Sequence, residues 1–108
     1  MKAFDPQYPL LAEMYQDHYY PAFLVDKIKA SLLLVIEFLQ TGTKDLAAIQ
    51  AKLDEAVIAI NDLQDEFDAH DSELETIARE AIAANVVYIL NWFNIDLDIE
   101  EALRERDW

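Results

Sequence analysis

The chain has 108 residues, of which 54% are hydrophobic, and its 22 acidic against eight basic residues give a formal net charge of −14. One helical domain over residues 1–108 with a single core fits this length, whereas the charge opposes binding to nucleic acid and to anionic membranes. With no cysteine and a single glycine, the sequence excludes disulfides, thiolate metal sites, thiol nucleophiles and glycine-rich phosphate loops.

The N-terminal segment and the lengths of the apolar runs indicate where in the cell the protein is expected. Residues Met1–Pro6 lack the apolar stretch of a signal peptide, so we expect a cytoplasmic protein. The longest apolar run, Leu32–Ile36, is far shorter than the roughly 18 residues that a membrane-spanning helix needs. All three prolines lie within the first 21 residues, which leaves the rest of the chain free to be helical.

Apolar periodicity predicts two helices in the first part of the chain. A short helix from about Leu10 ends before Pro21, because the residue that precedes a proline is disfavoured in the helical conformation. A second helix runs from about Pro21 to Gln40. Leu33 and Leu34 fall outside its main apolar stripe, which indicates a helix that is central in a bundle or covered by a second subunit.

The third predicted helix begins with Thr43 as its N-cap and runs to Phe67. Its apolar residues recur at alternating steps of three and four from Leu46 onward, and most of its carboxylates lie on the opposite side. These carboxylates form a candidate acidic interaction face: Asp54, Glu55, Asp62, Asp65 and Asp68. Because they point outward, the helix is expected to be a scaffold with a negatively charged surface.

A fourth helix is predicted from about Glu73 to Phe93. Ser72 and Glu75 have the spacing of a capping box, in which each side chain satisfies a free backbone N–H of the other residue. Residues 68–71 would then form a short turn between antiparallel helices.

We expect a specific role for each of three polar residues in the last part of the chain. Asn85 lies on the apolar face of the fourth helix, where we favour a register device or a hydrogen bond to a tyrosine or the backbone over a ligand contact. Arg79 follows Glu75 by four residues, the spacing of an ion pair within a helix, with a bridge to acids of the third helix as the alternative. Asp98 is the predicted N-cap of a short last helix.

The main chemical alternative is a divalent-metal site, which would make the protein a small metal-dependent helical hydrolase. Its candidate ligands are Asp62, Glu66, His70 and Glu73. Carboxylate-bridged metal sites in helical bundles need several acids that project inward, commonly with a Glu-x-x-His pair on each of two helices. The sequence has no such pair, so we expect no metal, no other cofactor and no catalytic residue, and we lean against an enzyme.

Several blocks of the sequence are similar to a known family. The blocks are Glu13–Pro21, Leu24–Lys27, Asn61–Leu63, Phe67–Glu80 and Ile99–Trp108. Over essentially its full length, the chain resembles a family of small bacterial proteins catalogued only as a domain of unknown function. The resemblance implies a bacterial origin and a self-contained helical domain, and it assigns no functional residue.

Together these patterns predict an all-α protein, an up-and-down helical bundle of four to five helices. The third and fourth helices are expected to form an antiparallel hairpin, with the second helix packed against them. We expect a non-enzymatic acidic interaction protein of the adaptor, inhibitor or immunity type. Its partner would be a protein, with a basic one favoured by charge, and it would bind the acidic face or the Leu33 and Leu34 surface.

Two further possibilities follow from the same surfaces. Homodimerisation through the surplus apolar surface of the second and fourth helices is a subsidiary expectation. Mimicry of DNA by regularly spaced carboxylates is another, and it predicts salt-sensitive binding to basic nucleic-acid-binding proteins.

Overall fold

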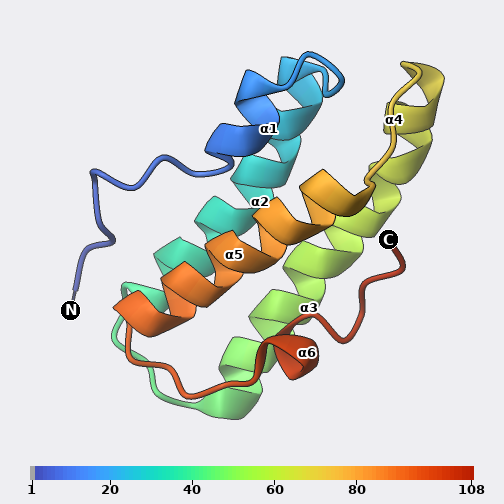
Figure 1. The fold of residues 1–108 in the computed structure, drawn as a ribbon. Helices are drawn as coiled ribbons and strands as arrows, with labels where there is room; N and C mark the ends of the chain where they lie inside the picture. The colour runs from blue at the N-terminus through green and yellow to red at the C-terminus, as the bar shows by residue number, and fades with distance from the viewer. Residues whose placement is uncertain (1) are drawn as a thin grey trace.

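Three long and three short helices make up the computed structural model, which describes residues 2–108 (Figure 1). In chain order they are α1 (Ala12–Gln16), α2 (Ala22–Leu39), α3 (Leu46–Asp62), α4 (Gln64–Ala69), α5 (Thr76–Trp92) and α6 (Ile99–Ala102). No strand is present in this part of the chain, so the predicted all-α bundle is confirmed. Over residues 2–108, no helix has both the length and the apolar character needed to cross a membrane.

The closest helix pair is α2 and α3. They are joined by the short loop Gln40–Asp45, and such a connection makes consecutive helices antiparallel neighbours. The predicted antiparallel hairpin of the third and fourth helices, which correspond to α3 and α5, is therefore not the central pair. Because α4 and residues 70–75 intervene between α3 and α5, α5 is free to lie obliquely across the α2 and α3 pair, as Figure 1 shows.

The core lies where these three long helices and α4 meet. Its members include fully buried residues of α2, α3, α4 and α5, such as Leu24, Ile28, Ile49, Ile60, Phe67 and Ile82. Leu33 and Leu34 lie on the outer side of α2, and Leu34 is 62% exposed. The predicted stripe of α2 is thus buried without help from Leu33 and Leu34, and a second copy that covers these two residues stays a prediction.

The start and the end of the third predicted helix differ from expectation. Asp45 and not Thr43 is the N-cap of α3, since the Asp45 carboxylate accepts hydrogen bonds from the two backbone N–H groups of the first turn at 3.1 and 3.3 Å. The helix expected to continue to Phe67 breaks at Leu63, which ends α3 and precedes α4. Phe67 of α4 is nevertheless fully buried in the core, on the side that the apolar period predicts.

The predicted capping box of Ser72 and Glu75 is wrong. The end of α4 forms a Schellman motif, in which Asp71 has a left-handed backbone (φ 56°) and the Ser72 N–H donates to the carbonyl of Phe67 at 2.9 Å. Ser72 therefore closes α4 instead of opening the next helix. As a result α5 begins only at Thr76, with Glu75 as an N-cap whose side chain makes no capping bond.

Candidate functional site

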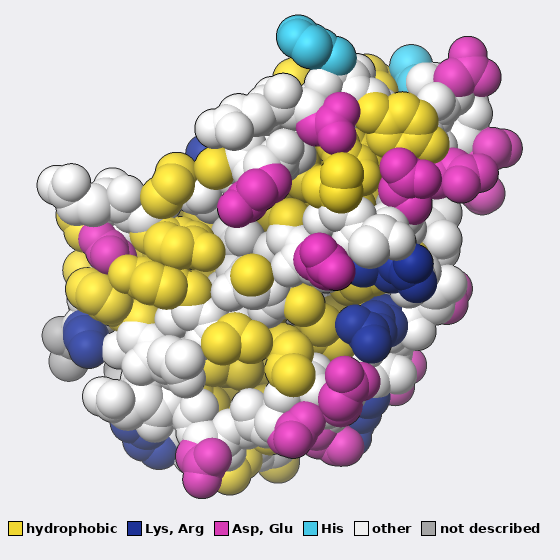
Figure 2. Space-filling model, viewed as in Figure 1, with side chains coloured by type: hydrophobic (Ala, Val, Ile, Leu, Met, Phe, Trp, Pro, Cys, Tyr) yellow, Lys and Arg dark blue, Asp and Glu magenta, His cyan; other side chains and the backbone are white. Residues whose placement is uncertain are grey.

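Carboxylates gather at one end of the molecule, around α4 and the loop that follows it. Residues 62–75 contain seven carboxylates and neither lysine nor arginine, so this segment accounts for half of the formal net charge of −14. These seven residues, the acidic tip, are Asp62, Asp65, Glu66, Asp68, Asp71, Glu73 and Glu75. In the view of Figure 2 a cluster of acidic side chains projects at the end where α4 lies.

The structure divides the predicted acidic face into two parts. Asp62, Asp65 and Asp68 are exposed, and no ion pair within residues 2–108 involves them. Asp54 and Glu55 instead have cationic partners. Asp54 lies 2.7 Å from Arg104, and Glu55 lies 3.4 Å from Lys52.

Asp54 is a contact between α3 and the C-terminal segment. Its side chain is only 18% exposed, because residues 103–108 run along this side of α3. The hydrogen bond from Arg104 holds the pKa of Asp54 below its ordinary value, and the Gln50 amide donates a further bond at 2.8 Å. The expectation that Asp54 faces away from the rest of the protein is therefore wrong, since sequence periodicity does not foresee the docking of a distant segment.

Two exposed aromatic side chains border the acidic tip. Tyr19 is 38% exposed and Phe23 is 48% exposed, and the Phe23 ring meets the His70 ring edge-on with centroids 5.0 Å apart. Burial, and next the charges of Glu75 and Glu73, raise the pKa of Tyr19 above its ordinary value, so its hydroxyl lies within the field of the tip. Tyr19 and Phe23, which lie just before and at the start of α2, thus share a surface with the end of α4 and the loop that follows it.

The four candidate metal ligands make separate contacts or are exposed to solvent. Glu66 forms an ion pair with Lys27 of α2 at 2.7 Å, and the Nδ1 atom of His70 lies 2.9 Å from the Glu66 carbonyl oxygen. Asp62 and Glu73 are exposed. Within the described part of the chain, no three His, Asp or Glu side chains are grouped in a way that could hold a metal ion.

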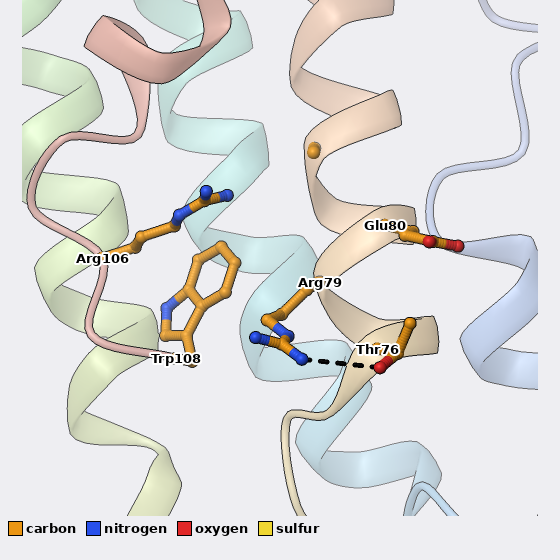
Figure 3. A pocket seen from close by; sticks show the side chains of 6 residues that line it. Thr76, Arg79, Glu80, Arg106 and Trp108 are labelled. Carbon is orange, nitrogen blue, oxygen red and sulfur yellow. Dashed lines mark hydrogen bonds between the residues drawn. The ribbon is translucent and has the colours of Figure 1, made fainter.

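A hollow, here named the arginine groove, lies between the first half of α5 and the C-terminal segment (Figure 3). It has a volume of about 340 Å³ and is lined by Thr76, Arg79, Glu80, Ala83, Arg106 and Trp108. The Arg79 guanidinium donates to the Thr76 hydroxyl at 3.4 Å. Neither predicted ion pair of Arg79, with Glu75 or with the acids of α3, is present among residues 2–108.

One amide fixes the C-terminal side of the arginine groove. The Asn61 Nδ2 atom donates to the carbonyl of Glu105 at 2.7 Å, and the Asn61 Oδ1 atom accepts the N–H of Asp107 at 3.2 Å. Gln64 donates a further hydrogen bond to the Asp107 carboxylate. These bonds hold residues 105–107 against the end of α3, directly before Trp108. Since 27 positions separate Arg79 from Arg106, no local motif could have indicated this site.

Asn85 is satisfied by the backbone. Its side chain amide donates to the Ala81 carbonyl at 2.7 Å, and its Oδ1 atom accepts the N–H of Leu11 at 3.0 Å. Asn85 is only 2% exposed. The predicted hydrogen bond to the backbone is therefore confirmed, and Asn85 joins α5 to the start of α1.

Comparison with known proteins supports the resemblance noted in the sequence. A model described as "Family of unknown function (DUF5713)" matches residues 4–108. The chain has no match among curated proteins and none among solved structures. A function must therefore be argued from the surface itself.

Proposed function

We propose that this chain, which belongs to the family of unknown function DUF5713, is a non-enzymatic binding protein whose acidic tip engages a basic protein partner. One observation carries the proposal: the segment that holds seven carboxylates without a lysine or arginine contacts the exposed ring of Phe23 through His70, and its Glu73 and Glu75 lie near the exposed ring of Tyr19. Aromatic anchors with charged surroundings are typical of protein interfaces.

The charge of the tip specifies the chemistry of the partner. Carboxylates held close together repel one another, and a surface of lysine and arginine side chains relieves that repulsion while it steers the encounter. Within the tip, only Glu66 has a lysine partner in the described residues. Two copies of this surface would repel each other, so a homodimer, if formed, would use the Leu33 and Leu34 side of α2 and leave the tip available.

A matched pair of double variants tests the proposal. Asp65→Asn with Asp68→Asn removes two charges from α4, whereas Glu37→Gln with Asp96→Asn removes two charges from exposed residues outside the tip. The probe is a synthetic amphipathic helix of lysine and leucine, titrated into the full chain by calorimetry. We expect the α4 double variant to bind about tenfold more weakly, and the control variant to bind almost as well as the native chain.

A separate variant tests whether the exposed aromatic side chains contribute to binding. Phe23→Ala should weaken binding of the same peptide, and amide chemical shifts should move at residues 19–23 and 62–75. Equal losses in the two double variants, or shift changes spread evenly over all acidic residues, would show adsorption by overall charge and would contradict a specific tip surface.

A further inference from the structure

Within residues 2–108, Arg79 forms no ion pair with a carboxylate, although the protein is strongly acidic. The chain has three arginines against 22 acidic residues. Arg104 and Arg106 form ion pairs, with Asp54 at 2.7 Å and with Glu100 at 3.4 Å. The Arg79 guanidinium makes only the 3.4 Å bond to the Thr76 hydroxyl within residues 2–108. Glu80, its neighbour in sequence, points away from the Trp108 side of the groove in Figure 3.

The guanidinium of Arg79 therefore keeps most of its hydrogen-bonding capacity for a ligand. An arginine side chain has five N–H donors in a planar fork, and the fork matches the two oxygens of a carboxylate. Arg79 stands on α5, a helix of 17 residues, so a regular element and not a mobile loop presents it.

Trp108 supplies a flat wall opposite Arg79. In Figure 3 its indole lies between the Arg106 and Arg79 side chains. The Arg106 guanidinium carbon is 5.8 Å from the indole centroid, which is within the range of a cation–π contact. The two hydrogen bonds between Asn61 and the backbone of Glu105 and Asp107 anchor the segment that ends in Trp108. A planar ring bound in the groove could stack on the indole while its anionic group meets Arg79.

Size and charge narrow the ligand class. A hollow of about 340 Å³ is at the small end of sites for organic ligands, which favours a molecule of one or two rings. The net charge of −14 repels anions in proportion to their charge, so a single carboxylate is favoured over a phosphate dianion. We propose that the arginine groove binds small planar aromatic monocarboxylates, with Arg79 at the carboxylate and Trp108 against the ring.

Calorimetric titration of the full chain with 1-naphthoate, benzoate, acetate and phenyl phosphate at pH 8 tests this proposal. We expect saturable binding of 1-naphthoate, weaker binding of benzoate, and no detectable binding of acetate or phenyl phosphate. Amide shifts should move at residues 76–83 and 106–108. The proposal is overturned if acetate or phenyl phosphate binds as tightly as 1-naphthoate, or if 1-naphthoate does not saturate the protein.

Two variants with the same change in charge identify the carboxylate contact. Arg79→Gln should weaken 1-naphthoate binding about tenfold, the loss typical of one charge-assisted hydrogen-bonded pair. Lys52→Gln alters a different hollow, between α2 and α3, and should leave binding within about twofold of the native value. Equal effects of the two substitutions would mean that only the overall charge matters, and the assignment of Arg79 would fail. Both residues are at the surface, so neither change should prevent folding.

Discussion

Asn85 ties α5 to a strained residue at the start of α1. Leu11, whose N–H it accepts, is fully buried and has φ 58°. A left-handed backbone costs a residue other than glycine on the order of 1 kcal/mol, and it persists only where the surroundings fix it. Burial of the Leu11 side chain and the hydrogen bond that its N–H donates to Asn85 supply that constraint, so the amide helps to set where α1 begins.

Asn85→Leu should destabilise the protein because it leaves the Leu11 N–H buried and unpaired. An unsatisfied buried donor costs about 1 to 3 kcal/mol. For a domain of this size, the melting temperature should fall by roughly 10 °C. Asn91→Leu is the matched control, since Asn91 is an exposed residue of the same helix. Circular dichroism during heating measures both, and equal melting temperatures for the two variants would contradict a specific role of the Asn85 amide.

At the scale of elements, α4 and α5 end in the same way. Asp71 and Asn94 both have φ near +57°, at 56° and 57° respectively. Each is followed by a residue whose N–H donates to a carbonyl five positions earlier, from Ser72 to Phe67 and from Ile95 to Leu90, both at 2.9 Å. This Schellman geometry stops the helix and turns the chain. It therefore determines how α4 leads into the loop of the acidic tip.

Replacements at Asp71 test the cost of this turn. Glycine adopts a left-handed backbone without the steric penalty of a Cβ atom, so Asp71→Gly should be more stable than Asp71→Ala by about 1 kcal/mol. Both variants remove the same charge from the tip, and the comparison therefore isolates the backbone effect. Urea unfolding followed by tryptophan fluorescence gives the two free energies. If the alanine variant is as stable as the glycine variant, Asp71 does not hold a left-handed backbone in solution.

The docking of the C-terminal segment should depend on pH through Asp54. Since the Arg104 bond lowers the pKa of Asp54 in the folded protein, its stabilising effect is present above the ordinary value of 3.8 and is lost as the pH falls through the folded value. Asp54→Asn should therefore cost about 0.5 to 1 kcal/mol at neutral pH, and the difference from the native chain should shrink below pH 3.8. Urea titrations at several pH values measure it. Asp96→Asn, at an exposed position, should show no such pattern.

Local signals made part of this architecture predictable. The apolar period placed α2 and α5 to within a few residues, and Asp98 accepts the Glu100 N–H at 2.8 Å as the expected cap of α6. The break at Leu63 was not predicted, because the heptad pattern continues through it. The turn predicted over residues 68–71 is present at residues 70–71, but the left-handed backbone of Asp71 was not predicted, because aspartate is not a distinctive signal for it.

The surfaces were less predictable than the helices. The exposure of Asp62, Asp65 and Asp68 follows from helical phase alone. The contact of Phe23 with His70, the position of Tyr19 near Glu73 and Glu75, and the arginine groove arise from contacts between segments distant in sequence. Periodicity within one helix carries no information about such contacts.

At the scale of the whole molecule, the overall distribution of charge should affect the stability of the fold more than any single ion pair does. The protein measures 40 × 28 × 18 Å and carries a formal net charge of −14. At about 10 mM salt the Debye length is roughly 30 Å, comparable with the length of the molecule, so that nearly all carboxylates repel one another. At about 150 mM it is roughly 8 Å, so repulsion between carboxylates that lie far apart on the molecule is largely screened.

The melting temperature of the native chain should therefore rise as NaCl is increased from about 10 to 150 mM, because screening relieves repulsion that exists mainly in the compact state. The melting temperature of the double variant Asp65→Asn with Asp68→Asn should rise less than that of Glu37→Gln with Asp96→Asn. The first variant removes two negative charges from the acidic tip, where the carboxylates are most concentrated in the sequence. Scanning calorimetry at four salt concentrations measures all three proteins. If the melting temperature of the native chain stays constant, repulsion between carboxylates does not destabilise the fold. If the melting temperatures of the two double variants rise equally with salt, this repulsion is spread over the whole molecule and is not concentrated in the acidic tip.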